Sequence, residues 1–194
     1  MPGIEDHEVV SIYPLSPEQI DRLLTDATEC VLMWGTQDHW PVGVYHSYVW
    51  QDGKIWITFA VHRHRTAAIR RDPRVSVAVS GVAGRSRDCP RGSITVKGRA
   101  TIREDRETKD WFYRALAHKA FPTDAAAEED FVERLDSPLR IIIEISPEKW
   151  ITFDAEKSAK DLAGTLTDAE RGPRLNADAE RMGKERALRG LGPR

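Results

Sequence analysis

The feature that most constrains the fold is the pair Asp52-Gly53, which lies between two runs of alternating apolar and polar residues. A type I′ turn needs positive φ at both central residues, and Asp-Gly is one of the pairs that tolerates this. Residues 42–60 are therefore predicted to form one β-hairpin. Alternation along its second strand separates two faces, with Ile55, Ile57 and Phe59 on one and Trp56, Thr58 and Ala60 on the other.

A basic turn, His62-Arg63-His64-Arg65, follows the hairpin directly. It opens a short helix that is expected to end at Asp72-Pro73, because the proline ring disfavours α geometry in the residue before it. Residues 74–80 then alternate strictly, which predicts another strand. Cationic side chains beside the free N–H groups of a helix N-terminus form an anion site, although exposed arginines are also common on surface turns.

The remaining elements predict a mainly β protein with flanking helices. Ser16-Pro17-Glu18-Gln19 combines an N-cap serine, a first-turn proline and a capping-box glutamine, which predicts a helix to about Thr28. The clearest strand is residues 93–103, where apolar and polar residues alternate throughout. The other predicted elements are a strand at 30–36, a loop at 81–92, helices at 106–120 and 124–136, and a strand at 139–145 that resumes at 149–153 beyond a break at Pro147.

Composition excludes several classes of protein. The chain has 194 residues, of which 40% are hydrophobic, so it is long enough for one sizeable core. A formal net charge of -2 gives no electrostatic case for a nucleic-acid partner. We expect no membrane span and no export signal, because the sequence has neither a long apolar run nor a charged and then apolar leader. Cys30 and Cys89 have neither metal-ligand nor redox spacing, so a cytoplasmic location is expected.

The composition changes from Asp154 onward, where aromatic residues stop and charged residues dominate. Such a segment cannot bury much surface alone, which predicts a solvated tail that is partly disordered or helical. Residues 175–191 have helix-forming composition, so a helix that docks on a partner subunit is the alternative. The predicted organisation is a folded domain over residues 1–153 and a charged tail over residues 154–194.

The order of hairpin, basic turn, short helix and Arg-Asp-Pro-Arg-Val-Ser-Val strand resembles the pyridoxamine 5′-phosphate oxidase-like, flavin-binding split-barrel superfamily. The likeness extends over roughly residues 16–153, through the capped helix, the strand with Lys97-Gly98-Arg99-Ala100 and the segment Pro147-Glu148-Lys149-Trp150. It implies a split β-barrel with peripheral helices and a homodimer that holds a flavin at the subunit interface. The sequence departs from the common family form at Arg65, where lysine is usual, and at Ala68, where asparagine is frequent.

The resemblance also implies which residues contact the cofactor. The basic turn becomes a phosphate site, since guanidinium groups match phosphate oxygens and the hydroxyl of Thr58 or Thr66 adds further contacts. The first hairpin strand is expected along the isoalloxazine ring, residue 93 near the ribityl chain or phosphate, and residue 150 near the ring of the partner's flavin. The expected cofactor-binding set is Gly43, Val44, Tyr45, Thr58, Phe59, Arg63, His64, Arg65, Ser93 and Trp150.

No catalytic side chain is evident, which is expected where the cofactor carries the hydride. A metal site at His62 and His64, with His46 on the facing strand, is disfavoured because zinc needs a further ligand. FMN is the first choice of cofactor, with a small molecule as substrate. The alternatives are a deazaflavin coenzyme of the 8-hydroxy-5-deazaflavin type and a non-catalytic protein that binds flavin or haem. The true oxidase is least favoured, because its C-terminal Arg-x-His pattern is missing after Trp150.

Overall fold

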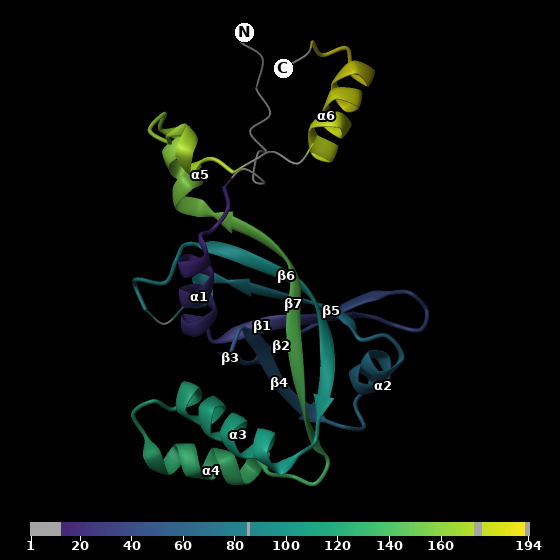
Figure 1. The fold of residues 1–194 in the computed structure, drawn as a ribbon, viewed down its shortest axis with the longest axis vertical. Coiled ribbons are helices and arrows are strands. Elements are labelled where there is room, and N and C mark those ends of the chain that lie inside the picture. The colour runs from purple at the N-terminus through teal and green to yellow at the C-terminus, as the bar shows by residue number, and fades with distance from the viewer. Residues whose placement is uncertain (1–12, 85, 173–175, 193–194) are drawn as a thin grey trace.

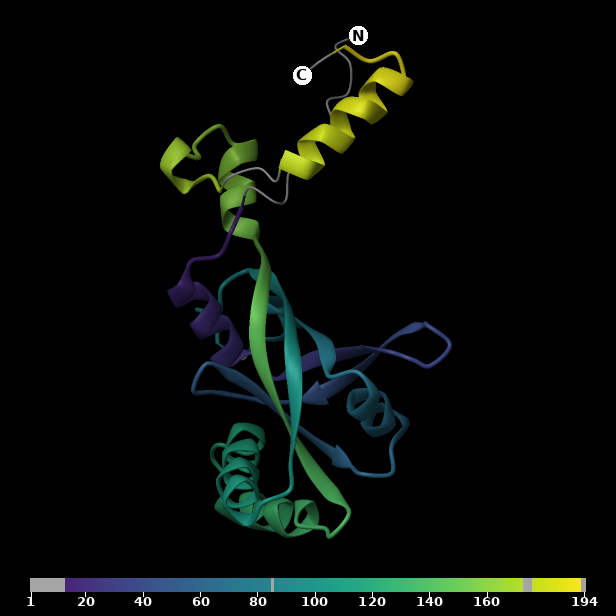
Figure 2. The same cartoon turned by 45° about the vertical axis from the view of Figure 1, so that its right-hand side comes forward.

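The computed structural model describes residues 13–84, 86–172 and 176–192. Seven antiparallel strands form one sheet in the order β2-β1-β5-β6-β7-β4-β3, and the sheet curls into the half-barrel of a split-barrel fold (Figure 1). Helices α3 and α4 lie at one end of the sheet, and α5 and α6 lie beyond the other end (Figures 1 and 2). The elements are α1 (Pro17–Asp26), β1 (Glu29–Gly35), β2 (Pro41–Ser47), β3 (Val49–Gln51), β4 (Lys54–Ala60), α2 (His64–Arg71), β5 (Arg74–Ser80), η2 (Gly81–Ala83), β6 (Gly92–Arg103), α3 (Arg106–Ala120), α4 (Ala125–Leu135), β7 (Arg140–Asp154), α5 (Ala155–Leu162), η3 (Asp168–Glu170) and α6 (Asn176–Leu188).

The predicted turn is confirmed, but the predicted hairpin over residues 42–60 is wrong in its first strand. Asp52 has φ 53° and Gly53 has φ 70°, as a type I′ turn requires, and this turn joins β3 to β4. Strand β2 pairs instead with β1, with Tyr45 opposite Val31. The chain leaves β2 at Tyr48, a fully buried residue whose hydroxyl donates to the carbonyl of Leu24 at 2.7 Å. The buried Tyr48 therefore lies at the break between β2 and β3, which the alternating pattern predicted to be one continuous strand.

The two longest strands, β6 and β7, pair along most of their length. A break at Pro147 was predicted, but β7 is continuous because the ladder shifts by one residue between Lys97 and Gly98. A bulge accommodates a proline that has no N–H to donate. The close approach also explains the glycine, since a Cβ on Gly98 would lie 2.5 Å from the carbonyl oxygen of Ser146.

Two apolar clusters hold the sheet in place. The larger fills the barrel, where Leu32, Ile57, Val77 and Val96 are fully buried. The smaller packs α3 and α4 against the outer faces of β4 and β7, and consists of Val49, Trp56, Phe112, Tyr113, Leu116, Leu135 and Ile142. Burial at about 25 cal/mol per Å² of apolar surface makes these clusters the main source of stability.

The buried carboxylate Glu144 of β7 binds the Lys54 and Arg103 side chains, which lie on the two neighbouring strands β4 and β6. Desolvation opposes the charge of Glu144, but the hydrogen bonds from Lys54 and Arg103 leave its pKa lowered overall. The carboxylate therefore stays ionised and links β4, β6 and β7 through its two ion pairs. Strand β4 is the one that leads into α2.

The C-terminal segment is helical at α5 and α6, where the sequence predicts a partly disordered or helical tail. Tyr13 donates its hydroxyl to Asp161 of α5 at 2.5 Å, and Leu166 is buried beside Tyr13 and Phe153. Residues 1–12 of the predicted domain and residue 175 of the predicted helix lie outside the described residues. No helix in the described part of the chain is long and apolar enough to cross a membrane.

Candidate functional site

Positively charged side chains lie together at the N-terminus of α2, shortly after the chain leaves β4. Arg63 is the N-cap residue, with φ -70° and ψ 145°, and within the described residues no side chain caps this end of the helix. The first N–H groups of an α-helix have no partner inside the helix, so they remain available to an anion. His64 begins the helix and Arg65 follows, and the first turn holds no acidic residue.

Arg65 is held in place by an aromatic ring. Its Cζ lies 4.5 Å from the ring centroid of Phe59, the buried penultimate residue of β4, which is the geometry of a cation–π contact. The Nε of Arg65 is buried and has no hydrogen-bond partner among the described residues. Desolvation and the neighbouring Arg63 both lower the pKa of Arg65. The Arg65 guanidinium is therefore positioned by packing on Phe59, and its Nε–H lacks a hydrogen-bond acceptor among the described residues.

A histidine from the other side of the barrel completes this cluster. The His46 ring, on β2, lies 5.7 Å from the Phe59 ring between centroids. Its Nε2 is also buried without a hydrogen-bond partner in the part of the chain that the structure describes. Burial first, and the charge of Arg65 second, lower the pKa of His46 to about 4. We call His46, Phe59, Arg63, His64 and Arg65 the α2 site.

The α2 site fits a phosphate group on its own chemistry. Buried polar groups are normally hydrogen-bonded, so the unpaired Nε–H of Arg65 indicates a missing acceptor. The unpaired Nε2 of His46 lies on a ring that contacts the same Phe59 side chain. Two arginines and a helix N-terminus supply donors and positive charge to such an acceptor.

The two hydroxyl groups that were predicted to contact the phosphate, those of Thr58 and Thr66, donate to backbone carbonyls. Thr58 donates to the carbonyl of Ile141 at 2.8 Å, and Thr66 donates to the carbonyl of Ala60 at 3.4 Å. Thr58 also lies on the opposite face of β4 from Phe59, because successive strand residues alternate.

Other predicted cofactor contacts gather on the outer face of the sheet. Tyr45 and Ser93 line one hollow of about 270 Å³. Gly43 is on the same face, where an added Cβ would lie 2.9 Å from a methyl carbon of Val31, so any larger residue would crowd this strand. Val44 points the other way and packs against the core. Strand β2 is an edge strand of the sheet, with Tyr45 on its outer face and His46 of the α2 site on the opposite face.

Trp150, the last predicted contact, lies with Trp50 and not with Arg65. The two indole rings meet edge to face, with centroids 6.1 Å apart and planes at 83°. Trp150 is half-buried against the barrel core. Within one subunit, the structure therefore separates Trp150 from the α2 site.

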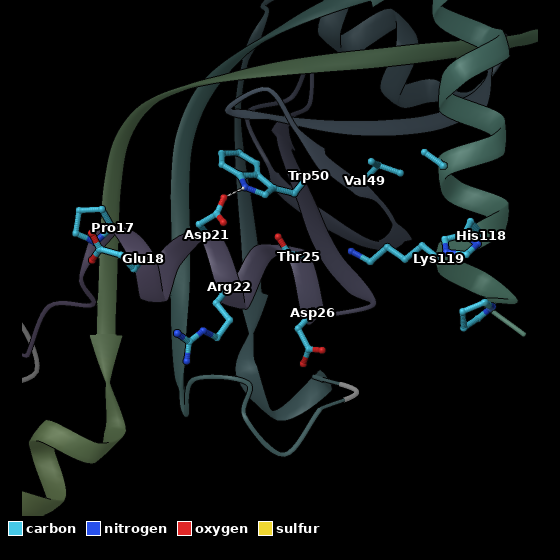
Figure 3. Close-up of a pocket in the computed structure, with 12 residues that line it drawn as sticks. Pro17, Glu18, Asp21, Arg22, Thr25, Asp26, Val49, Trp50, His118 and Lys119 are labelled. Atoms are coloured by element: carbon cyan, nitrogen blue, oxygen red, sulfur yellow. Dashed lines mark hydrogen bonds between the residues drawn. The ribbon is translucent and has the colours of Figure 1, made fainter.

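A hollow of about 960 Å³ lies elsewhere, between α1, β3 and α3. Figure 3 shows this α1–α3 cleft, in which the Lys119 side chain of α3 extends toward α1. Several of its polar groups already have partners. Trp50 donates to Asp21 at 2.8 Å, the Ser86 N–H donates to Asp26 at 3.1 Å, and His118 lies 2.8 Å from Glu128. Across the described residues, no group of three His, Cys, Asp or Glu side chains is arranged to hold a metal ion.

The fold is shared with several solved structures of low sequence identity. The conserved hypothetical protein Rv2991 from Mycobacterium tuberculosis is 20% identical with a TM-score of 0.63, covering 74% of this chain and 87% of that protein. A FAD-binding protein from Mesorhizobium loti is 17% identical with a TM-score of 0.52, covering 73% and 94%. A protein described as an F420 reductase is 19% identical with a TM-score of 0.50, covering 68% and 94%.

Sequence comparison is more specific than these structural likenesses. The family model described as pyridoxamine 5′-phosphate oxidase matches residues 16–154, from the N-cap of α1 to the end of β7. No curated protein matches the sequence. The matched segment includes every residue of the α2 site.

Proposed function

The chain belongs to the pyridoxamine 5′-phosphate oxidase family, and from this premise we propose that it binds FMN through the α2 site and acts as an oxidoreductase on a small molecule. The observation that supports this most directly is Arg65, a guanidinium fixed over Phe59 with a buried Nε that lacks an acceptor. A phosphate at the N-terminus of α2 supplies that acceptor. The family's name reaction itself is not proposed, because the Arg-x-His pattern is missing after Trp150.

Bound flavin supplies hydride transfer, which no protein side chain supplies by itself. The residues of the chain then bind and orient it. Arg65 and Arg63 hold the phosphate, and Phe59 keeps the Arg65 guanidinium from reorienting. Gly43 and Tyr45 of the edge strand are proposed to contact the ring, with Ser93 near the ribityl chain.

A second copy of the chain is the proposed partner, and the outer face of the sheet supports this. One row across five strands consists of Tyr45, Val31, Ala78, Thr95 and Ile151. Tyr45 is 72% exposed and Ile151 is 49% exposed, and exposed apolar patches of this kind mark interaction surfaces. We expect sedimentation at micromolar concentration to give twice the 22.0 kDa mass of one chain. A flavin-loaded monomer would overturn the dimer, and Tyr45→Asp should dissociate it.

A deazaflavin coenzyme is the second candidate, since one protein of similar fold is described as an F420 reductase. A further hollow of about 460 Å³ includes Arg74, Lys97 and Glu148 in its lining. Arg74 of β5 is paired with Asp72, and Arg99 of β6 is paired with Glu148. Lys97, also on β6, forms no ion pair with the described residues. An unpaired cation there suits a cofactor with a longer anionic tail.

The absorption spectrum of the purified protein tests the proposal, followed by titration with FMN, riboflavin, the deazaflavin coenzyme and haem. We expect flavin bands or saturable FMN binding, with weaker binding of riboflavin because it lacks the phosphate. Tight deazaflavin binding with negligible FMN affinity would favour the second candidate. A Soret band without any flavin binding, or no saturable binding of any of the four, would overturn the proposal.

A further inference from the structure

We propose that His46 is an anion-binding residue of the α2 site, which takes up one proton from solvent as a phosphate monoester binds and then donates its Nε2–H to a phosphate oxygen. This inference rests on the proposed function and adds to it a residue and a coupled proton. The sequence alone indicates His46 only as a disfavoured metal ligand beside His62 and His64, so its place in an anion site comes from the tertiary structure.

The first support is geometric. His46 comes from β2, Phe59 from β4 and Arg65 from α2, and the Phe59 ring contacts both of the others. Strands β2 and β4 are not neighbours in the sheet, so only its curvature brings these side chains together. The buried nitrogens of His46 and Arg65 both lack a hydrogen-bond partner among the described residues. One anion between the imidazole and the guanidinium satisfies both.

The second support is the charge around the imidazole. From α2, Arg65 is the charged group that acts on His46, and its effect is repulsive. From β1, the facing residue is Cys30, whose thiol pKa burial raises to about 12, so it is neutral at physiological pH. From β4, the facing residue is the uncharged Phe59. His46 is consequently neutral while the site holds no anion, with a pKa lowered to about 4.

An arriving phosphate reverses this balance. A phosphate monoester is close to doubly charged at pH 7, and it offsets the charge of Arg65 and accepts a hydrogen bond from the protonated ring. The pKa of His46 therefore rises on binding, so protonation and binding favour one another. Affinity should increase as the pH falls through the pKa of the bound state toward the lower pKa of the free state, with a limit of about tenfold per pH unit for one coupled proton.

Two calorimetric measurements test the coupling on the full chain. FMN is titrated at pH 7.5, 7.0, 6.5 and 6.0 in two buffers that differ in ionisation enthalpy, so that proton uptake is counted directly. We expect the wild type to take up about half to one proton more than His46→Gln, and its affinity to rise about three- to tenfold per pH unit relative to that variant. Riboflavin should show neither effect, because it has no phosphate.

Matched controls separate a role in binding from a general effect. His118→Gln changes an exposed histidine of the α1–α3 cleft and should leave both the proton uptake and the pH slope unchanged. The second ionisation of the phosphate contributes equally to FMN binding by wild type and by His46→Gln. The difference in pH slope between these two proteins is therefore due to His46. Identical slopes in wild type and His46→Gln, with both variants folded by circular dichroism, would overturn the inference.

Inorganic phosphate distinguishes failure of this inference from failure of the proposed function. The His46 ring is followed by NMR from pH 4 to 8 with phosphate and, as a control, with chloride. If no flavin binds but phosphate raises the pKa of His46, the flavin proposal fails and the anion role of His46 stands. If phosphate leaves the His46 titration unchanged while FMN binds, the flavin proposal stands and His46 is not an anion contact.

Discussion

The α2 site and the α1–α3 cleft differ in whether their buried polar groups already have hydrogen-bond partners. The cleft is a hollow of about 960 Å³, yet Trp50, Asp26 and His118 on its walls already bond to neighbouring groups. The α2 site brings together two buried nitrogens that lack partners among the described residues. Since leaving a buried polar group unpaired costs about 1–3 kcal/mol, unmet hydrogen bonds identify a binding site better than volume does. Substitutions in the cleft should therefore alter stability, and those in the α2 site should alter affinity.

Arg65→Ala should give the largest effect and would break this contrast if it did not. Hydrogen bonds to charged groups contribute about 1.5–3 kcal/mol, so we expect FMN affinity to fall roughly ten- to a hundredfold while the fold is kept. Fluorescence titration measures the loss. Arg71→Ala, at the far end of α2, and Arg22→Ala, in the cleft, are the controls and should change affinity less than about twofold. Equal losses in all three variants would indicate general electrostatics instead of a phosphate site.

Trp50→Ala sharpens the contrast from the side of the cleft. The substitution removes the edge-to-face contact with Trp150 and the hydrogen bond to Asp21. Because Trp50 is only half-buried, we expect the free energy of unfolding to fall by about 2 kcal/mol, below the range for a fully buried tryptophan. Urea denaturation reports that change, and FMN affinity should stay within about twofold of wild type. A tenfold loss of FMN affinity without a loss of stability would place the cofactor in the cleft.

Acid should destabilise the α2 site through His46. The folded pKa is lowered from 6.5 to about 4, so the unfolded chain binds the proton more tightly between these values. The contribution to stability is complete above pH 6.5 and is lost as the pH falls toward 4. Each pKa unit corresponds to about 1.4 kcal/mol, and partial solvent screening reduces the total to about 1–2 kcal/mol.

Comparison of wild type with His46→Gln isolates this contribution, since the carboxylates titrate alike in both. The free energy of unfolding of the wild type should fall more than that of the variant between pH 6.5 and 4. His118→Gln, in the cleft, should follow the wild type. Parallel curves for all three proteins would show that His46 is not desolvated in the folded state.

The smallest expected effect is that of Lys97→Ala on FMN. Lys97 lies on β6 in the hollow of about 460 Å³, outside the α2 site. FMN has one phosphate, so its affinity should change by less than about twofold in this variant. The deazaflavin coenzyme, with its longer anionic tail, should lose about three- to tenfold. Parallel titrations of both cofactors measure these losses. A loss of FMN affinity in Lys97→Ala as large as that in Arg65→Ala would show that FMN binding does not distinguish the α2 site from the hollow at Lys97.

What the sequence by itself determined lies within a few residues along the chain. The Asp52-Gly53 turn adopts the positive φ values that were predicted, and both hydrogen bonds of the capping box between Ser16 and Gln19 are present. The alternation of β6 places Ile94 and Val96 in the core. The basic turn was located together with Phe59, Arg63, His64 and Arg65. These features follow from local backbone preferences and from the period of two along a strand, which need no knowledge of the rest of the fold.

Only the tertiary structure decided which strands are neighbours and which side chains meet. Alternation has the same period whatever the partner strand, so the sequence predicted β2 opposite β4, although β2 pairs with β1. A single proline was read as a break because the bulge that accommodates it depends on the partner strand β6. His46 approaches Phe59 only because the sheet curls until non-adjacent strands face each other. The position of His46 in the α2 site is therefore set by long-range packing, which local periodicity does not encode.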